Sequence, residues 1–157
     1  VIPVGMLPHD SHATAESSAA GRREVELAGM RAVMAIEREL GFTPRDRSAD
    51  NCGYDIESVV PDELHAKGPA LRMIEVKGRT AGATTVTVSH NEVMCALNRP
   101  DAFVLALVEV DGNTTRTSYI AHPFTSPPDY AAASTNYDIE RLKEAGDVIL
   151  EREQEWQ

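Results

Sequence analysis

Apolar residues recur at helical spacing in the first third of the chain, over residues 22–40. Their positions are Val25, Met30, Val33, Ile36 and Leu40. This spacing predicts a helix from residue 22 to residue 40, with Gly41 just beyond its end. Residues 1–21 show no clear apolar period and contain prolines and serines. We therefore interpret residues 1–21 as a linker or tail.

Short runs of β-branched or alternating residues after this helix predict strands. The strands are expected at about residues 54–60, 71–77, 84–89, 102–110 and 116–121. The polar segment 42–51 is compatible with a further short strand at its start. Residues 102–110 are nearly all apolar, which is typical of a strand buried on both faces.

Turn and cap residues divide these strands and predict further helices. Ser89 and Glu92 fit a capping box that opens a helix over residues 91–97. Another helix is expected to start within residues 138–144. Turns or loops are expected at residues 61–69, 78–83 and 123–129. The charged chain end is expected to lie on the surface. The order predicts an α/β fold, an α/β/α sandwich around a central mixed sheet, with helices before and after a three-strand meander over residues 54–89.

The composition fits one globular domain over residues 22–157. The chain has 157 residues, of which 42% are hydrophobic and 25% charged. No apolar run approaches the roughly 20 residues of a membrane span, so no membrane partner is expected. No signal peptide is recognised, and Cys52 and Cys95 form neither a disulfide framework nor a zinc spacing, so we expect reduced thiols and a cytoplasmic location. The chain does not begin with Met, and we expect it to be a fragment of a larger protein.

The formal net charge of −10 argues against a domain that grips nucleic acid by overall electrostatic attraction. A local basic surface remains compatible with this charge. If the partner is DNA or RNA, we expect another part of the parent protein to bring it to this domain.

Two of the expected strands carry charged residues where a half-buried strand usually carries apolar ones. Glu75 and Lys77 are two residues apart and therefore project from one face, and Asp55 joins them if the two strands are neighbours. Two carboxylates and an ammonium are costly to hold together, and a hard divalent cation is the simplest reason to do so. The alternative is that Asp55 caps a turn and that Glu75 pairs with Lys77 or Arg79 on an exposed sheet face.

The motifs Gly53-Tyr54-Asp55-Ile56 and Ile74-Glu75-Val76-Lys77-Gly78 resemble those of the PD-(D/E)xK nuclease superfamily. More narrowly, the chain is similar to the NO VEIN C-terminal domain and its helicase-associated relatives. That pattern includes spaced glutamates in an N-terminal helix and a later Asn-Glu that opens a helix, supplied here by Glu26, Glu37 and Asn91-Glu92. The resemblance spans about residues 22–122.

The resemblance implies a restriction-endonuclease-like core and a metal-dependent nuclease acting on nucleic acid, with DNA as the expected substrate. Asp55, Glu75 and the Val76 carbonyl would hold Mg²⁺ or Mn²⁺. Glu26 or Glu37 would supply a further acidic group, and the sequence leaves the choice between them open. Lys77 would orient or deprotonate the attacking water.

Other expectations concern substrate and partners. Arg79 and Asn91 are candidate substrate-binding residues, and the resemblance implies a helicase domain or a defence-related protein as the partner. One alternative is a catalytically silent module with a nuclease-like fold that binds nucleic acid or protein. A second alternative is an interaction or oligomerisation domain, including a homodimer formed through an exposed sheet edge.

Overall fold

The computed structural model describes residues 11–157, with side chains described from residue 18 onward. The helices are α1 (Ser11–Glu39), α2 (His90–Asn98) and α3 (Ile139–Ala145), with short 3₁₀ helices at Ser48–Asp50 and Asp62–Lys67. The strands are β1 (Thr43–Asp46), β2 (Ile56–Val59), β3 (Leu71–Thr80), β4 (Thr85–Ser89), β5 (Phe103–Asp111), β6 (Thr114–Ala121), β7 (Ser134–Asp138) and β8 (Asp147–Glu155).

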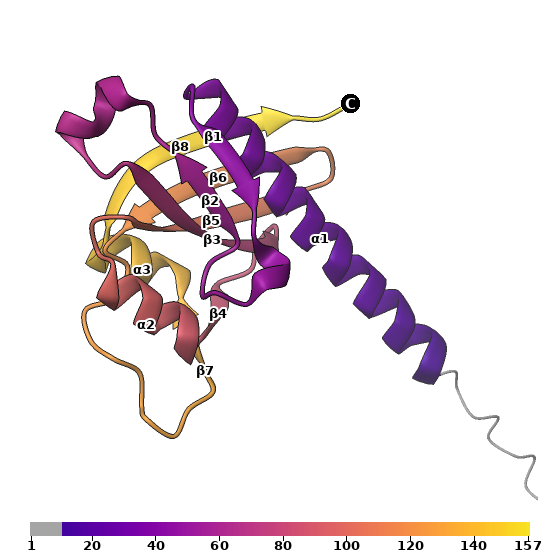
Figure 1. Ribbon diagram of the computed structural model, residues 1–157. Coiled ribbons are helices and arrows are strands. Elements are labelled where there is room, and N and C mark those ends of the chain that lie inside the picture. The colour runs from indigo at the N-terminus through magenta and orange to yellow at the C-terminus, as the bar shows by residue number, and fades with distance from the viewer. Residues whose placement is uncertain (1–10) are drawn as a thin grey trace, which may run out of the picture.

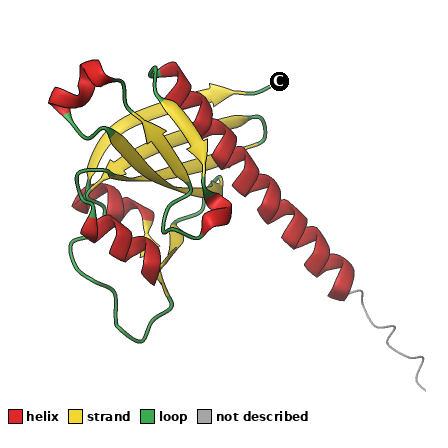
Figure 2. Ribbon diagram, viewed as in Figure 1, coloured by secondary structure: helices red, strands yellow, loops and turns green. Residues whose placement is uncertain are grey.

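A six-stranded sheet forms the centre of the fold, in the order β1-β2-β3-β5-β6-β8 (Figures 1 and 2). Strands β3 and β5 run parallel, whereas the other neighbours run antiparallel. The expectation of a central mixed sheet is therefore confirmed. Strands β4 and β7 form a separate two-stranded sheet.

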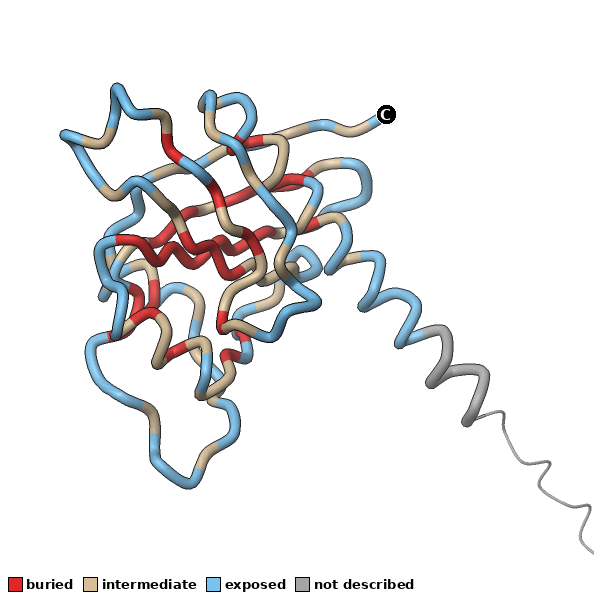
Figure 3. Tube along the Cα trace, in the orientation of Figure 1, coloured by how far each residue is buried: buried red, intermediate tan, exposed pale blue. Residues whose placement is uncertain are grey.

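Two hydrophobic cores lie on opposite faces of the large sheet. On one face, Val33 and Ile36 of α1 pack with Ile74 and Val104. On the other face, residues of α2, α3 and β4 pack with Phe103 and neighbouring residues of β5. Strand β5 lies between the two cores, and the buried segments concentrate along it and its neighbours (Figure 3). Its nearly continuous apolar sequence reflects burial on both faces.

The predicted three-strand meander is wrong in its third strand. Strands β1, β2 and β3 are consecutive antiparallel neighbours, but β4 pairs with β7 and not with β3. Val86 and Val88 of β4 are buried and pack on the same core as α2. Alternating burial in β4 therefore reflects contact with the face of the large sheet rather than membership in it.

Two strands near the chain end were not predicted. Strand β7 is mostly polar, and β8 is mostly charged, so neither has the apolar alternation of a typical strand. Strand β8 nevertheless pairs with β6 along most of its length, and Leu150 and Trp156 pack against the core beside α1. The chain end lies on the surface as expected, since none of residues 147–157 is buried, but it forms a strand there.

Helix α1 begins earlier than predicted, so the second half of the expected linker, residues 11–21, is helical. The first half, residues 1–10, lies outside the described residues. The N-terminal part of α1 extends away from the sheet (Figure 1). None of the helices within residues 11–157 is long and apolar enough to cross a membrane.

Helix α1 crosses β3 at a contact between glycines. A Cβ built on Gly29 would lie 3.4 Å from the Cα of Gly78, and one built on Gly78 would lie 2.6 Å from the carbonyl oxygen of Val25. The segment 78–83 was expected to be a turn, but β3 continues through Gly78 to Thr80. Glycine at position 78 therefore lets the strand continue directly beneath the helix.

Candidate functional site

Asp55 immediately precedes β2 and faces the strand that carries Glu75. The regular pairing of β2 with β3 ends at Ile56 and Ile74, and the Asp55 N–H donates to the carbonyl of the same Ile74 over 2.9 Å. Asp55 therefore lies at an irregular end of this strand pair, and its side chain lines the same cleft as Glu75. The Asp55 carboxylate also accepts a hydrogen bond from the Val76 N–H, with Oδ2 3.0 Å from N. Asp55 therefore joins the two strands and does not cap a turn.

Lys77 lies between two carboxylates that come from different elements. Its Nζ is 2.9 Å from Oε1 of Glu75 and 2.8 Å from Oε2 of Glu92. Glu75 and Lys77 are neighbours on one face of β3, whereas Glu92 comes from the first turn of α2. Glu75 contacts Lys77, as the alternative to metal binding expected, but Glu75 is buried and not on an exposed sheet face, and Glu92 shares Lys77.

Glu92 is the site residue that sequence reasoning did not select. It forms the predicted capping box, because the Ser89 N–H donates to its Oε2 over 2.8 Å and its own N–H donates to Ser89 Oγ over 3.2 Å. The sequence allowed Glu92 to face the site from the helix start, but the capping box was the role assigned to it. The same box fixes the carboxylate at the start of α2, where it reaches Lys77.

Burial and mutual repulsion shift the pKa values of these groups. Burial raises the pKa of Glu75 to about 9, and the nearby Asp55 and Glu92 add to this effect against the attraction of Lys77. Burial also raises the pKa of Asp55, against the opposing hydrogen bond from Val76. The pKa of Lys77 is raised because its carboxylate partners outweigh its burial, and that of Glu92 is lowered because Lys77 and Ser89 outweigh its burial. The site therefore holds protons readily on Glu75 and Lys77 when no further cation is bound.

The site opens into a cleft of about 510 Å³ between α1, β3 and α2. Asp55, Glu75, Lys77 and Glu92 line it from the sheet and from α2, and Glu26 lines it from α1. A smaller cavity of about 140 Å³ adjoins the cleft and shares Asp55, Glu75 and Glu92 with it. The charged residues are thus buried enough to interact strongly and open enough to receive a ligand.

The structure distinguishes Glu26 from Glu37, the two glutamates of α1 between which the sequence left the choice open. Glu26 faces the cleft, whereas Glu37 is fully buried. Oε1 of Glu37 lies 3.6 Å from Nη2 of Arg72, and the Arg72 guanidinium lies against the rings of Phe42 and Tyr119. Glu37 is therefore not brought together with Asp55 and Glu75. The two glutamates lie at different points along β3, because Val25, next to Glu26, contacts Gly78, whereas Glu37 lies beside Arg72.

The two predicted substrate-binding residues lie at the edges of the site. Arg79 is exposed and lines the cleft two residues beyond Lys77. Asn91 is exposed at the start of α2 and lines the smaller adjoining cavity. Its side-chain nitrogen would lie 3.5 Å from a Cβ built on Gly53, so the Gly53 turn and α2 pack closely together.

The oxygen donors at the site decide whether it suits a divalent cation. Within residues 11–157, no group of three or more His, Cys, Asp or Glu side chains is close enough together to hold a metal ion. The available set is two carboxylates, Asp55 and Glu75, and the carbonyl of Val76 between Glu75 and Lys77. Mg²⁺ is commonly held by one or two carboxylates and keeps several waters, so these hard oxygen donors fit it.

Comparison with known proteins identifies the chain's family. Residues 25–120 match the family described as Protein NO VEIN, C-terminal, and this is more than half of the chain. The chain therefore belongs to this family, and the resemblance to the NO VEIN C-terminal domain is confirmed. No curated protein and no solved structure matches the chain.

Proposed function

We propose that this member of the NO VEIN C-terminal family is a divalent-metal-dependent nuclease domain that hydrolyses phosphodiester bonds in nucleic acid, with DNA as the expected substrate. The observation that supports this proposal most is the pairing of β2 with β3. It brings Asp55 beside Val76, whose N–H the Asp55 carboxylate accepts, and Glu75 and Lys77 flank Val76 on one face of β3. Such a pair of carboxylates beside an ammonium is the chemistry of a restriction-endonuclease-like core, which is the fold proposed for this chain.

Asp55, Glu75 and the carbonyl of Val76 would hold Mg²⁺ or Mn²⁺. Bound there, the ion would polarise the scissile phosphate and lower the pKa of a bound water. Asp55 is held in place for this role by the N–H of Val76. Because burial raises the pKa of Glu75, this carboxyl gives up its proton when a cation binds.

Lys77 has the position and charge to act on the phosphate and on the attacking water. Its pKa is raised, because Glu75 and Glu92 outweigh its burial, so the side chain is a cation at neutral pH. A cation in a half-buried cleft stabilises the charge that develops on the phosphate oxygens and orients the water by hydrogen bonding. Glu26, on the opposite wall of the cleft, is the α1 glutamate that we propose as the additional acidic group.

A cleavage assay tests this proposal directly. Single- and double-stranded DNA and RNA are incubated with the purified chain in Mg²⁺, Mn²⁺ or EDTA. We expect cleavage in the metal-containing reactions and none above background for Asp55→Asn or Lys77→Met. Equal cleavage by the wild-type chain and both variants, or none with any substrate, would refute nuclease activity of this chain.

One observation favours a second candidate, a catalytically silent module that binds nucleic acid or protein. Lys77 already forms short ion pairs with Glu75 and Glu92, so the charged cluster is compatible with a purely structural role. Titration calorimetry separates the candidates, because the silent module predicts no Asp55-dependent uptake of Mg²⁺ or Mn²⁺. In either case, we propose that a helicase domain of the parent protein or complex presents the substrate, since the net charge of −10 opposes autonomous binding to nucleic acid.

A further inference from the structure

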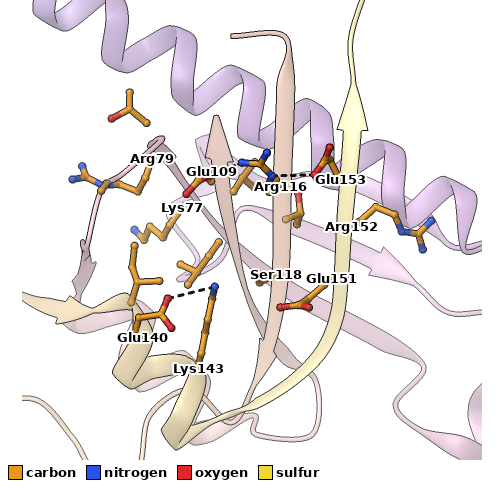
Figure 4. A pocket seen from close by; sticks show the side chains of 16 residues that line it. Lys77, Arg79, Glu109, Arg116, Ser118, Glu140, Lys143, Glu151, Arg152 and Glu153 are labelled. Carbon is orange, nitrogen blue, oxygen red and sulfur yellow. Dashed lines mark hydrogen bonds and ion pairs between the residues drawn. The ribbon is translucent and has the colours of Figure 1, made fainter. Parts of the chain in front are cut away.

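A third cavity lies on the same side of the large sheet as the candidate site, and its lining residues are drawn in Figure 4. Its volume is about 410 Å³, which is in the range of small-molecule binding pockets. It shares Lys77 and Arg79 with the cleft that holds Asp55 and Glu75. A strand of nucleic acid that reaches the candidate site can therefore continue directly into this cavity.

The floor of the cavity follows from the strand register. Lys77 of β3 pairs with Leu107 of β5, Leu107 pairs with Ser118 of β6, and Ser118 pairs with Glu151 of β8. Residues in register on neighbouring strands project from the same face. The row therefore places an ammonium, an apolar surface, a hydroxyl and a carboxylate side by side beneath the cavity.

A second row lies next to the first and alternates in charge. Arg79 pairs with Glu109, Glu109 with Arg116, and Arg116 with Glu153. Arg116 Nη1 is 3.1 Å from Oε1 of Glu109, and its Nε is 3.0 Å from Oε2 of Glu153. These three charges largely satisfy one another, whereas Arg79 forms no ion pair with the side chains that the structure describes. Arg79 is thus the cation of this row that remains available to a ligand.

Helix α3 supplies another wall of the cavity. Ile139 and Lys143 line the cavity, and Lys143 extends from the helix toward the sheet (Figure 4). Its Nζ is 3.8 Å from Oε1 of Glu140, which is longer than a charge-assisted hydrogen bond of about 2.8 Å. Lys143 is therefore only loosely held. The cavity is thus lined by two available cations, Arg79 and Lys143, and by the apolar side chains of Leu107 and Ile139.

We propose that this cavity binds one nucleotide of the nucleic-acid strand, adjacent to the phosphate that lies at Asp55 and Glu75. Arg79 and Lys143 contact the phosphate of the nucleotide bound in the cavity, and Leu107 and Ile139 contact the face of its base. Ser118 and Glu151 accept hydrogen bonds from amino or hydroxyl groups of the nucleotide. This inference rests on the proposed nuclease function and extends it by stating where the substrate strand lies.

Binding of dAMP to the ¹⁵N-labelled chain, followed by two-dimensional NMR in EDTA, tests the proposal without metal or cleavage. Adenosine and inorganic phosphate are titrated in parallel, since the site predicts that dAMP binds more tightly than either. We expect shifts at Leu107, Ser118 and the residues of α3. Lys143→Met should weaken dAMP binding about tenfold, the size expected for one charge-assisted hydrogen bond. Lys67→Met, which removes an exposed lysine of the β2–β3 connection, is the matched control and should bind as the wild type does.

Shifts outside the cavity, or equal affinity of wild type and Lys143→Met, would overturn the inference. The cleavage assay gives an independent result. A chain that binds dAMP in the cavity but cuts no nucleic acid would refute the nuclease proposal and leave the nucleotide site standing. A chain that cuts nucleic acid but binds dAMP elsewhere, or not at all, would refute the nucleotide site alone.

Discussion

The carboxylate of Asp55 accepts a hydrogen bond from the backbone N–H of Val76, with 3.0 Å between Oδ2 and N. This bond ties the acid that precedes β2 to the strand that carries Glu75 and Lys77. It uses one carboxylate oxygen and holds the side chain toward the cleft. The position of Asp55 is thus set by the backbone of its neighbouring strand. A neutral side chain that also accepts this hydrogen bond should keep the position while it removes the charge.

Asp55→Asn and Asp55→Ala should therefore differ in stability but not in activity. The amide oxygen of asparagine can accept the Val76 N–H, so Asp55→Asn should unfold at nearly the wild-type denaturant concentration. Asp55→Ala loses the bond and should be less stable by about 1 kcal/mol. Both variants should lose metal binding and cleavage. Urea unfolding and calorimetry check this, and a strongly destabilised Asp55→Asn would contradict it.

Lys77→Met should reduce both activity and stability, because it leaves Glu75 and Glu92 without their common cation. Breaking a buried ion pair typically costs about 3–5 kcal/mol, and protonation of Glu75 should reduce that cost here. Lys77→Arg keeps the positive charge and should recover much of the stability. Chemical unfolding of the three proteins tests this. A Lys77→Met protein as stable as the wild type would show that the observed ion pairs contribute little.

Glu75→Gln should become increasingly stable relative to the wild type as the pH rises. The pKa of Glu75 is raised to about 9, above the roughly 4.3 of an unfolded glutamate. At pH values between about 4.3 and 9, Glu75 is protonated in the folded chain and releases its proton on unfolding. Its contribution to stability is therefore full at low pH and lost as the pH rises toward 9. The difference between variant and wild type should grow by up to about 1.4 kcal/mol per pH unit. Unfolding curves at several pH values from 5.5 to 8.5 measure it, and parallel pH profiles would contradict the assignment.

Glu26→Gln and Glu37→Gln should affect different properties. Glu26 lines the cleft, so its variant should lower cleavage or metal affinity with little change in stability. Glu37 is buried beside Arg72, so its variant should change stability and leave metal affinity at the wild-type value. Calorimetry with Mn²⁺ and thermal unfolding separate the two. Lost metal binding in Glu37→Gln alone would show that the wrong helix glutamate has been assigned to the site.

Gly78→Ala should destabilise the contact between α1 and β3. The added Cβ would lie 2.6 Å from the Val25 carbonyl oxygen, so the helix or the strand has to move. Overpacking of this kind typically costs about 1–3 kcal/mol. Gly21→Ala is the control, because a Cβ there meets nothing within 4 Å and alanine favours the helix. A thermal shift assay should show a lower melting temperature for the first variant only.

Much of the fold followed from local patterns. The capping box of Ser89 and Glu92, the buried apolar strand β5 and the pair of strands around Asp55 and Glu75 were predicted where they occur. Each depends on residues close in sequence or on alternation along one segment. Strands β7 and β8 were not predicted, because their polar sequences become strands only through pairing with β4 and β6.

The sequence by itself predicted which residues gather at the candidate site: the shared face of Glu75 and Lys77 follows from the two-residue period of a strand. Only the tertiary structure decided which helix residues join them. It placed Glu37 beside Arg72, Glu26 on the cleft and Glu92 against Lys77. The reason is that helical spacing shows only which residues share one side of a helix. Which part of the sheet that side meets depends on contacts between segments that are distant in sequence.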